Sequence, residues 1–198
     1  MHNKILIIGS SPRRGGNSDI IIEHFAKGAE NAGCESEIVQ LSGLNISPCV
    51  GCERCRKDKS CTRLNDDMTD IYEKIKHSKG LFMVSPVHNY NVTAWMKAFI
   101  DRMYCFYDFK EPRPNDWSSR LSGQNRQAVA AAVCEQLDVK DMGFTIEAMT
   151  MPLEALGYEV KDHLRFLGVF SKGAISEVET ALKKSEESGY NLAVSLKN

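Results

Sequence analysis

Four cysteines crowd into one short stretch of this chain and follow the spacing C-x2-C-x2-C-x5-C. Thiolates three residues apart can wrap one compact iron–sulfur cluster, and the longer last gap leaves enough chain to reach the fourth corner. Basic side chains surround the stretch, and they would offset the negative charge of a thiolate-bound cluster or dock an acidic partner. The cysteines are Cys49, Cys52, Cys55 and Cys61, and the basic residues are Arg54, Arg56, Lys57, Lys59 and Arg63.

Two other interpretations of this cysteine segment remain open. Zinc is one, although structural zinc sites usually combine two C-x2-C pairs across a longer span. Free thiols or a redox disulfide pair are the other. The chain has seven cysteines, an odd number, and cytosolic thiols stay reduced, so a framework of structural disulfides is not expected.

A second group of chemically useful residues lies in the loop GSSPRRGGNS at residues 9–18. The loop precedes a helical pattern, and the first turn of a helix offers free N–H groups to a phosphate. Its hydroxyl, amide and guanidinium side chains can add hydrogen bonds. Neither G-x-G-x-x-G nor G-K-[ST] occurs there, which excludes the dinucleotide fingerprint and the NTPase P-loop. The loop predicts a phosphate monoester site, or else a helix cap with a solvated basic loop.

The segment PVHNYN at residues 86–91 follows another apolar run and suits a flat ligand. Pro86 stiffens the turn. Asn89 and Asn91 offer hydrogen bonds to a heteroaromatic ring, and His88 or Tyr90 offers a ring that can stack on it. The alternative for His88 is an ordinary exposed loop residue.

The elements that must position these groups alternate between strand and helix. Short apolar runs predict strands, and apolar residues at helical spacing predict helices. Thr93 is expected to cap the helix that follows it, and Gly157 to end another. The expected strands cover residues 4–9, 35–41, 80–85, 127–134 and part of 158–169, and the expected helices cover 18–32, 67–78, 93–102, 144–156 and the residues from 174 onward.

Five strands joined by helices predict a doubly wound α/β domain whose parallel sheet is covered on both faces. Ligands bind at the carboxyl edge of such a sheet, so the loops after the first four strands should share that edge. The cysteine segment, within residues 42–66, is therefore expected to open beside the other loops. Residues 103–122 form an aromatic insertion, for which a core cover or a subunit contact is favoured over a lid on a planar ligand.

The composition restricts the classes of protein further. Hydrophobic residues make up 42% of the 198 residues and charged residues 26%, which excludes extensive disorder. A net charge of −1 argues against nucleic acid or membrane partners. No stretch approaches the roughly 18 apolar residues of a spanning helix, and the first residues have too short an apolar run for a signal peptide. We therefore expect one cytoplasmic domain over residues 1–198.

Taken together, four segments resemble the iron–sulfur flavoproteins, which belong to the wider NADPH-dependent FMN reductase family. The resemblance covers about the first half of the chain. It implies a flavodoxin-like fold with strand order 2-1-3-4-5, FMN as a cofactor and a [4Fe–4S] cluster. The segments are GSSPRRGGNS at residues 9–18, PCVGCERC at 48–55 together with Cys61, DDM at 66–68 and SPVHNYNVTAWMKAFIDR at 85–102.

The resemblance also implies roles for particular residues, and it implies homodimers or larger assemblies such as homotetramers. The loop at 135–138 lacks the glycines that are usual in such proteins, and we assign it no flavin contact. The implied residues are Ser10, Arg13, Asn17 and Ser18 for the FMN phosphate, Pro86, Val87, His88, Asn89, Tyr90 and Asn91 for the ribityl chain and isoalloxazine ring, and Cys49, Cys52, Cys55 and Cys61 for the cluster.

The expected function is that of an FMN-dependent oxidoreductase. It would pass electrons from NAD(P)H or a ferredoxin-type donor to an acceptor through FMN and the cluster. Because the cofactors carry the reaction, no catalytic side chain is expected. One alternative is a cluster-free NAD(P)H-dependent FMN or quinone reductase, and another is a non-enzymatic redox-sensing module.

Overall fold

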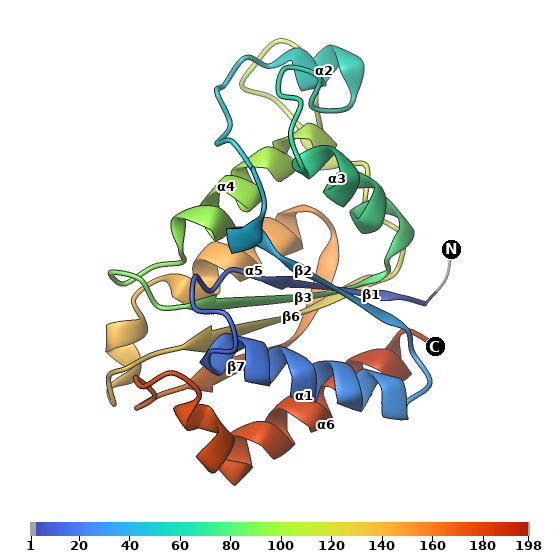
Figure 1. The fold of residues 1–198 in the computed structure, drawn as a ribbon. Coiled ribbons are helices and arrows are strands. Elements are labelled where there is room, and N and C mark those ends of the chain that lie inside the picture. Colours follow the sequence, from blue (N-terminus) through green and yellow to red (C-terminus); the bar gives the residue numbers. More distant parts are fainter. Residues whose placement is uncertain (1–2, 198) are drawn as a thin grey trace.

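The computed structural model describes residues 3–197 as a five-stranded parallel sheet between two layers of helices (Figure 1). The strand order is β2-β1-β3-β6-β7, which confirms the predicted doubly wound order 2-1-3-4-5. The sheet strands are β1 (Ile5–Gly9), β2 (Ser36–Gln40), β3 (Gly80–Pro86), β6 (Arg126–Val133) and β7 (Tyr158–Phe166).

Helices cover both faces of the sheet, and each face has its own hydrophobic core. Successive strand residues point to opposite faces, so Leu6 and Ile8 of β1 join one core while Ile5 and Ile7 join the other. This burial on both sides explains why the central strands are almost wholly apolar. The first core is covered by α3 (Met68–His77), α4 (Ala94–Arg102) and α5 (Thr145–Ala155), and the second by α1 (Asn17–Asn31) and α6 (Glu179–Ser195).

The helix ends follow the expected local chemistry. The Thr93 hydroxyl accepts a hydrogen bond from the N–H of Met96 at 3.2 Å and caps α4. Gly157 follows α5 with a φ of +93°, and its N–H donates to the carbonyl of Glu154 at 2.9 Å. The last helix begins at Glu179, because Ala174–Glu177 form a separate 3₁₀ turn. The predicted cap at Thr93 and the predicted helix end at Gly157 are therefore both confirmed.

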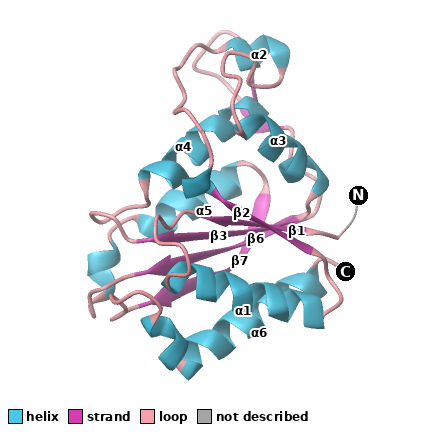
Figure 2. Ribbon diagram, in the orientation of Figure 1, coloured by secondary structure: helices cyan, strands magenta, loops and turns pink. Residues whose placement is uncertain are grey.

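Three short elements were not predicted from the sequence. A one-turn helix, α2 (Arg54–Asp58), lies inside the cysteine segment, and the aromatic insertion forms a hairpin of β4 (Tyr107–Phe109) and β5 (Trp117–Ser119). Figure 2 shows that α2 is surrounded by loops, away from the main layers. These elements have too few residues for a hydrophobic period to reveal them.

The path of the cysteine segment differs from the expectation. The carboxyl ends of the sheet strands lie together on the left of Figure 1, whereas α2 stands at the top, beyond α3 and α4. The prediction that the cysteines open beside the other loops is therefore wrong. The segment leaves the sheet after β2 and crosses over the helical layer instead of staying at the sheet edge. Among the helices of residues 3–197, none has the length and the apolar character that a membrane span requires.

Candidate cofactor and cysteine sites

The carboxyl edge of the sheet carries a cavity of about 220 Å³ that is lined by loops following β1, β3, β6 and β7. This is the place where a doubly wound sheet binds its ligands. Two segments that the sequence analysis selected separately, the loop after β1 and the segment after β3, meet here. The predicted residues that line the cavity are Arg13, Asn17, Ser18, Pro86, Val87 and His88.

Ser10 is placed away from this cavity. It is fully buried because it continues the pairing of β1 with β3. Its N–H donates to the carbonyl of Val84 at 3.1 Å, and its hydroxyl donates to the same oxygen at 3.3 Å. The next residue, Ser11, lines the cavity instead. A serine hydroxyl is thus present where the sequence predicted one, but it is displaced by one residue.

The first turn of α1 faces the cavity with unsatisfied donors. Gly16 is the N-cap and has no side chain to accept from the first N–H groups. In the described chain, no protein acceptor bonds the N–H of Asn17 or Ser18, and Ser18 also lines the cavity. Free N–H groups and the positive end of the helix dipole both favour an anion at this point.

The Asn17 carboxamide has a different task from the one predicted. Its Nδ2 donates to the carbonyl of Ser171 at 3.0 Å, and its Oδ1 accepts from the N–H of Ile175 at 3.2 Å. The side chain therefore ties the start of α1 to the loop after β7. What Asn17 offers to an anion is its backbone N–H.

Two cations border the cavity, and one of them was missed by the sequence analysis. The Arg13 guanidinium donates to the carbonyl of Phe170 at 3.1 Å and lies 5.4 Å from the centroid of its ring. Lys172 lines the cavity from the same loop. Neither cation pairs with a carboxylate within residues 3–197, although the exposed Glu135 also lines the cavity. Both Lys172 and Glu135 follow sheet strands, and the shared carboxyl edge is the signal that locates them.

The segment after β3 ends in a tight turn. His88 and Asn91 exchange backbone hydrogen bonds of 2.8 and 3.1 Å, while Asn89 and Tyr90 have φ angles of +52° and +65°. Two successive positive φ angles make this a two-residue type I′ turn. Asn89, Tyr90 and Asn91 do not line the cavity, and the Tyr90 side chain is 57% exposed. All three residues are exposed.

This turn rests on a glycine of the loop after β6. The carbonyl of Tyr90 accepts from the N–H of Phe144 at 2.9 Å. A Cβ at Gly143 would lie 2.1 Å from the same oxygen, and Gly143 has a φ of +55°. The conformation and the contact both require glycine. The second loop is thus fitted closely against the first.

Replacing Gly143 by alanine should therefore destabilise the protein more than its backbone strain alone does. Gly123→Ala is the control for a positive φ without a close contact, because Gly123 has a φ of +72° but open space around its Cβ position. Gly143 differs from it in the contact with Tyr90 and in a ψ of −125°, which with a positive φ is a combination dominated by glycine. We expect the control to lose about 1 kcal/mol of unfolding free energy and Gly143→Ala to lose about 1–3 kcal/mol more. Urea denaturation of both variants measures the difference. Equal losses would show that the turn yields to the added methyl without cost.

The four predicted cysteines surround a second cavity, of about 310 Å³. Cys49 and Cys52 are exposed, and Cys55 and Cys61 are half-buried. Burial raises the pKa of the Cys55 thiol, and the nearby thiol of Cys61 raises it further. Within residues 3–197, no three Cys, His, Asp or Glu side chains stand in position to hold a metal ion. The fold gathers the thiols around one space but does not by itself set them as ligands.

Both ends of the cysteine segment are fixed by a buried ion pair. Arg102, the last residue of α4, donates to the two carboxylate oxygens of Asp66 at 2.7 and 3.0 Å, and to the carbonyl of Ser47 at 2.9 Å. Asp66 also accepts from the N–H of Ser47 at 3.0 Å. Burial would raise the pKa of Asp66, but the hydrogen bonds from Arg102 and Ser47 outweigh it and hold this pKa below its usual value.

The two cavities lie at opposite ends of α4 and share no lining residue. The segment that lines the carboxyl-edge cavity leads into the N-terminus of α4, whereas Asp101, near its C-terminus, lines the cysteine cavity. A helix of nine residues spans about 13 Å. Within one chain the two sites are therefore separate, at a distance of about one short helix.

The charges around the cysteines divide into two groups. Arg56 pairs with Glu53 and Glu111, and Lys59 pairs with Asp108. The other three basic residues are exposed and make no ion pair in the part of the chain that the structure describes. They are Arg54, Lys57 and Arg63. Only this second group keeps an uncompensated positive charge near the thiols.

Comparison with known proteins finds relatives that match about half of the chain. An iron–sulfur flavoprotein from Archaeoglobus fulgidus is 38% identical over 109 residues, which cover 53% of this chain and 55% of that protein. An iron–sulfur flavoprotein from Methanosarcina thermophila is 37% identical over 99 residues, covering 50% of this chain and 51% of that one. The chain thus spans about half the length of the curated relatives that it matches.

The likeness of fold extends over the whole chain. An NAD(P)H:quinone oxidoreductase from Methanothermobacter marburgensis superposes with a TM-score of 0.76 at 17% identity, covering 97% of this chain and 100% of that one. The sequence profile described as NADPH-dependent FMN reductase matches residues 3–142. Because this match spans most of the chain and includes the loop after β1, the segment after β3 and the cysteine segment, the chain belongs to the NADPH-dependent FMN reductase family.

Proposed function

We propose that the protein is an FMN-dependent oxidoreductase that passes electrons between a reduced donor and an acceptor through FMN and a [4Fe–4S] cluster. The observation that carries the proposal is the meeting of the loop after β1 and the segment after β3 in one cavity with two unpaired cations. A phosphate at the first turn of α1 would find free N–H groups and positive charge together. The family match supports FMN as the phosphate-bearing ligand.

The residues for FMN come from three loops. The N–H groups of Asn17 and Ser18, with the Arg13 and Lys172 side chains, would hold the phosphate. Residues 86–91 would run along the ribityl chain and the ring, as the resemblance implies, and of these residues 86–88 line the cavity. When bound, FMN supplies hydride or single-electron exchange. The chain's own part is to bind and orient the cofactor at the edge of the sheet.

The cysteine segment would hold the cluster through Cys49, Cys52, Cys55 and Cys61, which border one cavity. When bound, a [4Fe–4S] cluster supplies one-electron transfer. The names of the relatives from A. fulgidus and M. thermophila support this assignment. We further propose NAD(P)H or a ferredoxin-type protein as the donor and a homodimer or homotetramer as the assembly, with residues 1–198 as one domain.

A second candidate function is a cluster-free NAD(P)H-dependent FMN or quinone reductase. One observation favours it, namely that the family whose profile matches residues 3–142 is described by FMN reduction alone and not by an iron–sulfur cluster. In that case the cysteines would bind zinc or remain thiols. A non-enzymatic redox-sensing module is the third possibility, and it predicts that the chain takes up no FMN.

The absorption spectrum of protein purified without oxygen separates these functions. Flavin bands on a broad absorbance that bleaches with dithionite support the paired cofactors. Flavin bands alone, without bound iron, support the cluster-free reductase. A colourless protein that takes up no added FMN contradicts both enzymes.

The Cys52→Ser variant tests the cluster ligands directly. Because the two cavities share no residue, we expect this variant to lose its bound iron but to keep one FMN per chain. Cys34→Ser is the control, since Cys34 is buried and its thiol donates to the carbonyl of Asn3, outside the cysteine segment. Iron, sulfide and flavin analysis provides the measurement. Full iron content in Cys52→Ser would show that the ligand assignment is wrong.

A further inference from the structure

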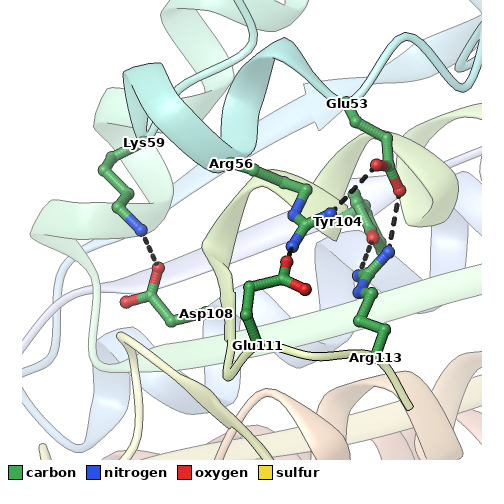
Figure 3. Close-up of polar contacts among 7 residues, drawn as sticks. All are labelled: Glu53, Arg56, Lys59, Tyr104, Asp108, Glu111 and Arg113. Atoms are coloured by element: carbon green, nitrogen blue, oxygen red, sulfur yellow. Dashed lines mark hydrogen bonds and ion pairs between the residues drawn. The ribbon is translucent and has the colours of Figure 1, made fainter. Parts of the chain in front are cut away.

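The aromatic insertion packs against the cysteine segment through a polar network (Figure 3). Arg113 donates to the Glu53 carboxylate at 2.9 Å and to the Tyr104 hydroxyl at 2.7 Å. Arg56 donates to Glu53 at 3.1 Å and also pairs with Glu111. We refer to residues 104–120 as the insertion hairpin. Through these contacts the insertion hairpin holds Glu53, the residue that precedes α2.

The other end of α2 is held by the same hairpin. The Lys59 ammonium pairs with Asp108 at 2.5 Å. Arg120 donates to the backbone carbonyl of Lys59 at 2.7 Å, to the carbonyl of Cys105 at 2.7 Å and to Asp108 at 3.1 Å. Arg120 therefore bonds the main chain at the end of α2 as well as a side chain of the hairpin.

The two residues that the hairpin anchors, Glu53 and Lys59, are also the residues of the cysteine segment with a strained backbone conformation. Glu53 and Lys59 bracket α2 with φ angles of +56° and +57°, the left-handed conformation that residues with a Cβ rarely adopt. Such conformations persist when the surroundings determine them. The helix between them has five residues and no side-chain cap, so it has little stability of its own. It carries Cys55 and begins two residues after Cys52.

The hairpin itself is anchored to the helical layer and can serve as a fixed support. The Ser119 hydroxyl donates to the carbonyl of Leu156 at 2.8 Å, and this serine is buried. The Arg113 guanidinium lies 3.9 Å from the centroid of the Phe109 ring. Exposed ion pairs contribute little individually. Here several pairs, a stacked guanidinium and a main-chain contact converge on one short turn.

We propose that the insertion hairpin is the positioning element of the cysteine site, and that Arg113 and Arg120 are its positioning residues. They hold Glu53 and Lys59 in the left-handed conformation, and thereby keep Cys52 and Cys55 turned toward the space that Cys49 and Cys61 share. The inference rests on the proposed function in so far as the thiols bind a cluster. It assigns the aromatic insertion a role in shaping that site, without a role at the carboxyl-edge cavity.

The test compares Arg113→Ala and Arg120→Ala with Lys110→Ala. Lys110 lies on the same hairpin but pairs with Asp116 of the hairpin at 3.0 Å and makes no bond to the cysteine segment within residues 3–197. Hydrogen exchange of the full chain follows residues 52–61, and bathophenanthroline follows the rate of iron loss after anaerobic reconstitution. We expect about tenfold faster exchange and iron loss in the two arginine variants. In Lys110→Ala, the exchange of residues 52–61 and the rate of iron loss should match those of the natural chain. The FMN content should be unchanged in all three variants.

A second set of variants, made in a chain with glycine at residue 59, tests whether Arg120 acts by holding the strained backbone of Lys59. Glycine adopts the left-handed conformation without penalty, and Lys59→Gly keeps the carbonyl that Arg120 contacts. The effect of Arg120→Ala on iron loss should therefore be smaller in a Lys59→Gly chain than in the natural one. An equal effect in both chains would overturn the strain argument. Lys59→Ala is the control, because it also loses the pair with Asp108 that Arg120 shares but keeps a Cβ, so it should not reduce the effect of Arg120→Ala as Lys59→Gly does.

The outcomes separate this inference from the proposed function. If the natural chain binds no iron, the cluster assignment fails, and the exchange of residues 52–61 alone decides whether the hairpin holds the cysteine turn. If the chain binds iron but the arginine variants match Lys110→Ala in exchange and iron loss, the inference is overturned. Faster exchange with unchanged iron loss also overturns it, because the turn would then not position the ligands.

Discussion

Replacing Asp66 by alanine is expected to lower the free energy of unfolding by about 3–5 kcal/mol, because it leaves a buried charge without its partner. The side chains of Arg102 and Asp66 are 1% and 4% exposed. The Nε of Arg102 already has no hydrogen-bond partner among the described residues. Loss of the carboxylate would leave the guanidinium with the carbonyl of Ser47 as its remaining bond. Urea denaturation at neutral pH measures the effect.

Asp67→Ala is the matched control for this prediction. Asp67 is the next residue and accepts one backbone hydrogen bond, from Asn45 at 2.7 Å, but it is exposed. We expect this control to lose no more than about 1 kcal/mol. If both variants lose the same amount, the buried pair does not contribute more than an exposed turn contact.

The same carboxylate should make stability depend on pH at the acid end. The pKa of Asp66 is lower in the folded protein than its ordinary value, which is about 3.9. Its stabilising contribution is therefore fully present above about pH 4 and is lost as the pH falls through the lower folded value. An Asp66→Asn chain removes this titration. We expect a shallower loss of stability below about pH 4 in that variant than in the natural chain.

The layers of the fold could be predicted because their signals are local. The run Ile5–Gly9 is apolar at every position and is buried at every position, so sequence and burial carry the same information. Thr93 and Gly157 act through backbone groups only a few residues away. Doubly wound topology then follows from the alternation of strands and helices.

The arrangement of the site could be predicted only in part, because it depends on contacts between distant segments. Ser10 is turned inward by pairing with Val84, which the repeated serines of the loop do not reveal. The conformation of α2 depends on the insertion hairpin, whose arginines contact residues 60 and 61 positions earlier in the chain. Lys172 follows the last strand, where no motif marks it. The rule of the shared carboxyl edge could have found it.

The charged groups at the carboxyl-edge cavity lead to the second large prediction. Arg13→Ala and Lys172→Ala should each weaken FMN binding about 10- to 100-fold, because a hydrogen bond to a charged group contributes about 1.5–3 kcal/mol. Neither cation has a carboxylate to neutralise it within residues 3–197, and both line the cavity beside the free N–H groups of α1. The effect should therefore depend on the phosphate.

Riboflavin, which lacks the phosphate, tests that dependence. Fluorescence titration of apoprotein should show weaker FMN binding in both variants and nearly unchanged riboflavin binding. Lys140→Ala removes the same charge from an exposed residue of the neighbouring loop that does not line the cavity. If Lys140→Ala weakens FMN binding as strongly, the phosphate is attracted by the overall positive field at this edge of the sheet. Direct contacts from Arg13 and Lys172 would then not be the cause of the affinity. If riboflavin binding falls as much as FMN binding, these cations support the shape of the cavity and do not recognise the phosphate.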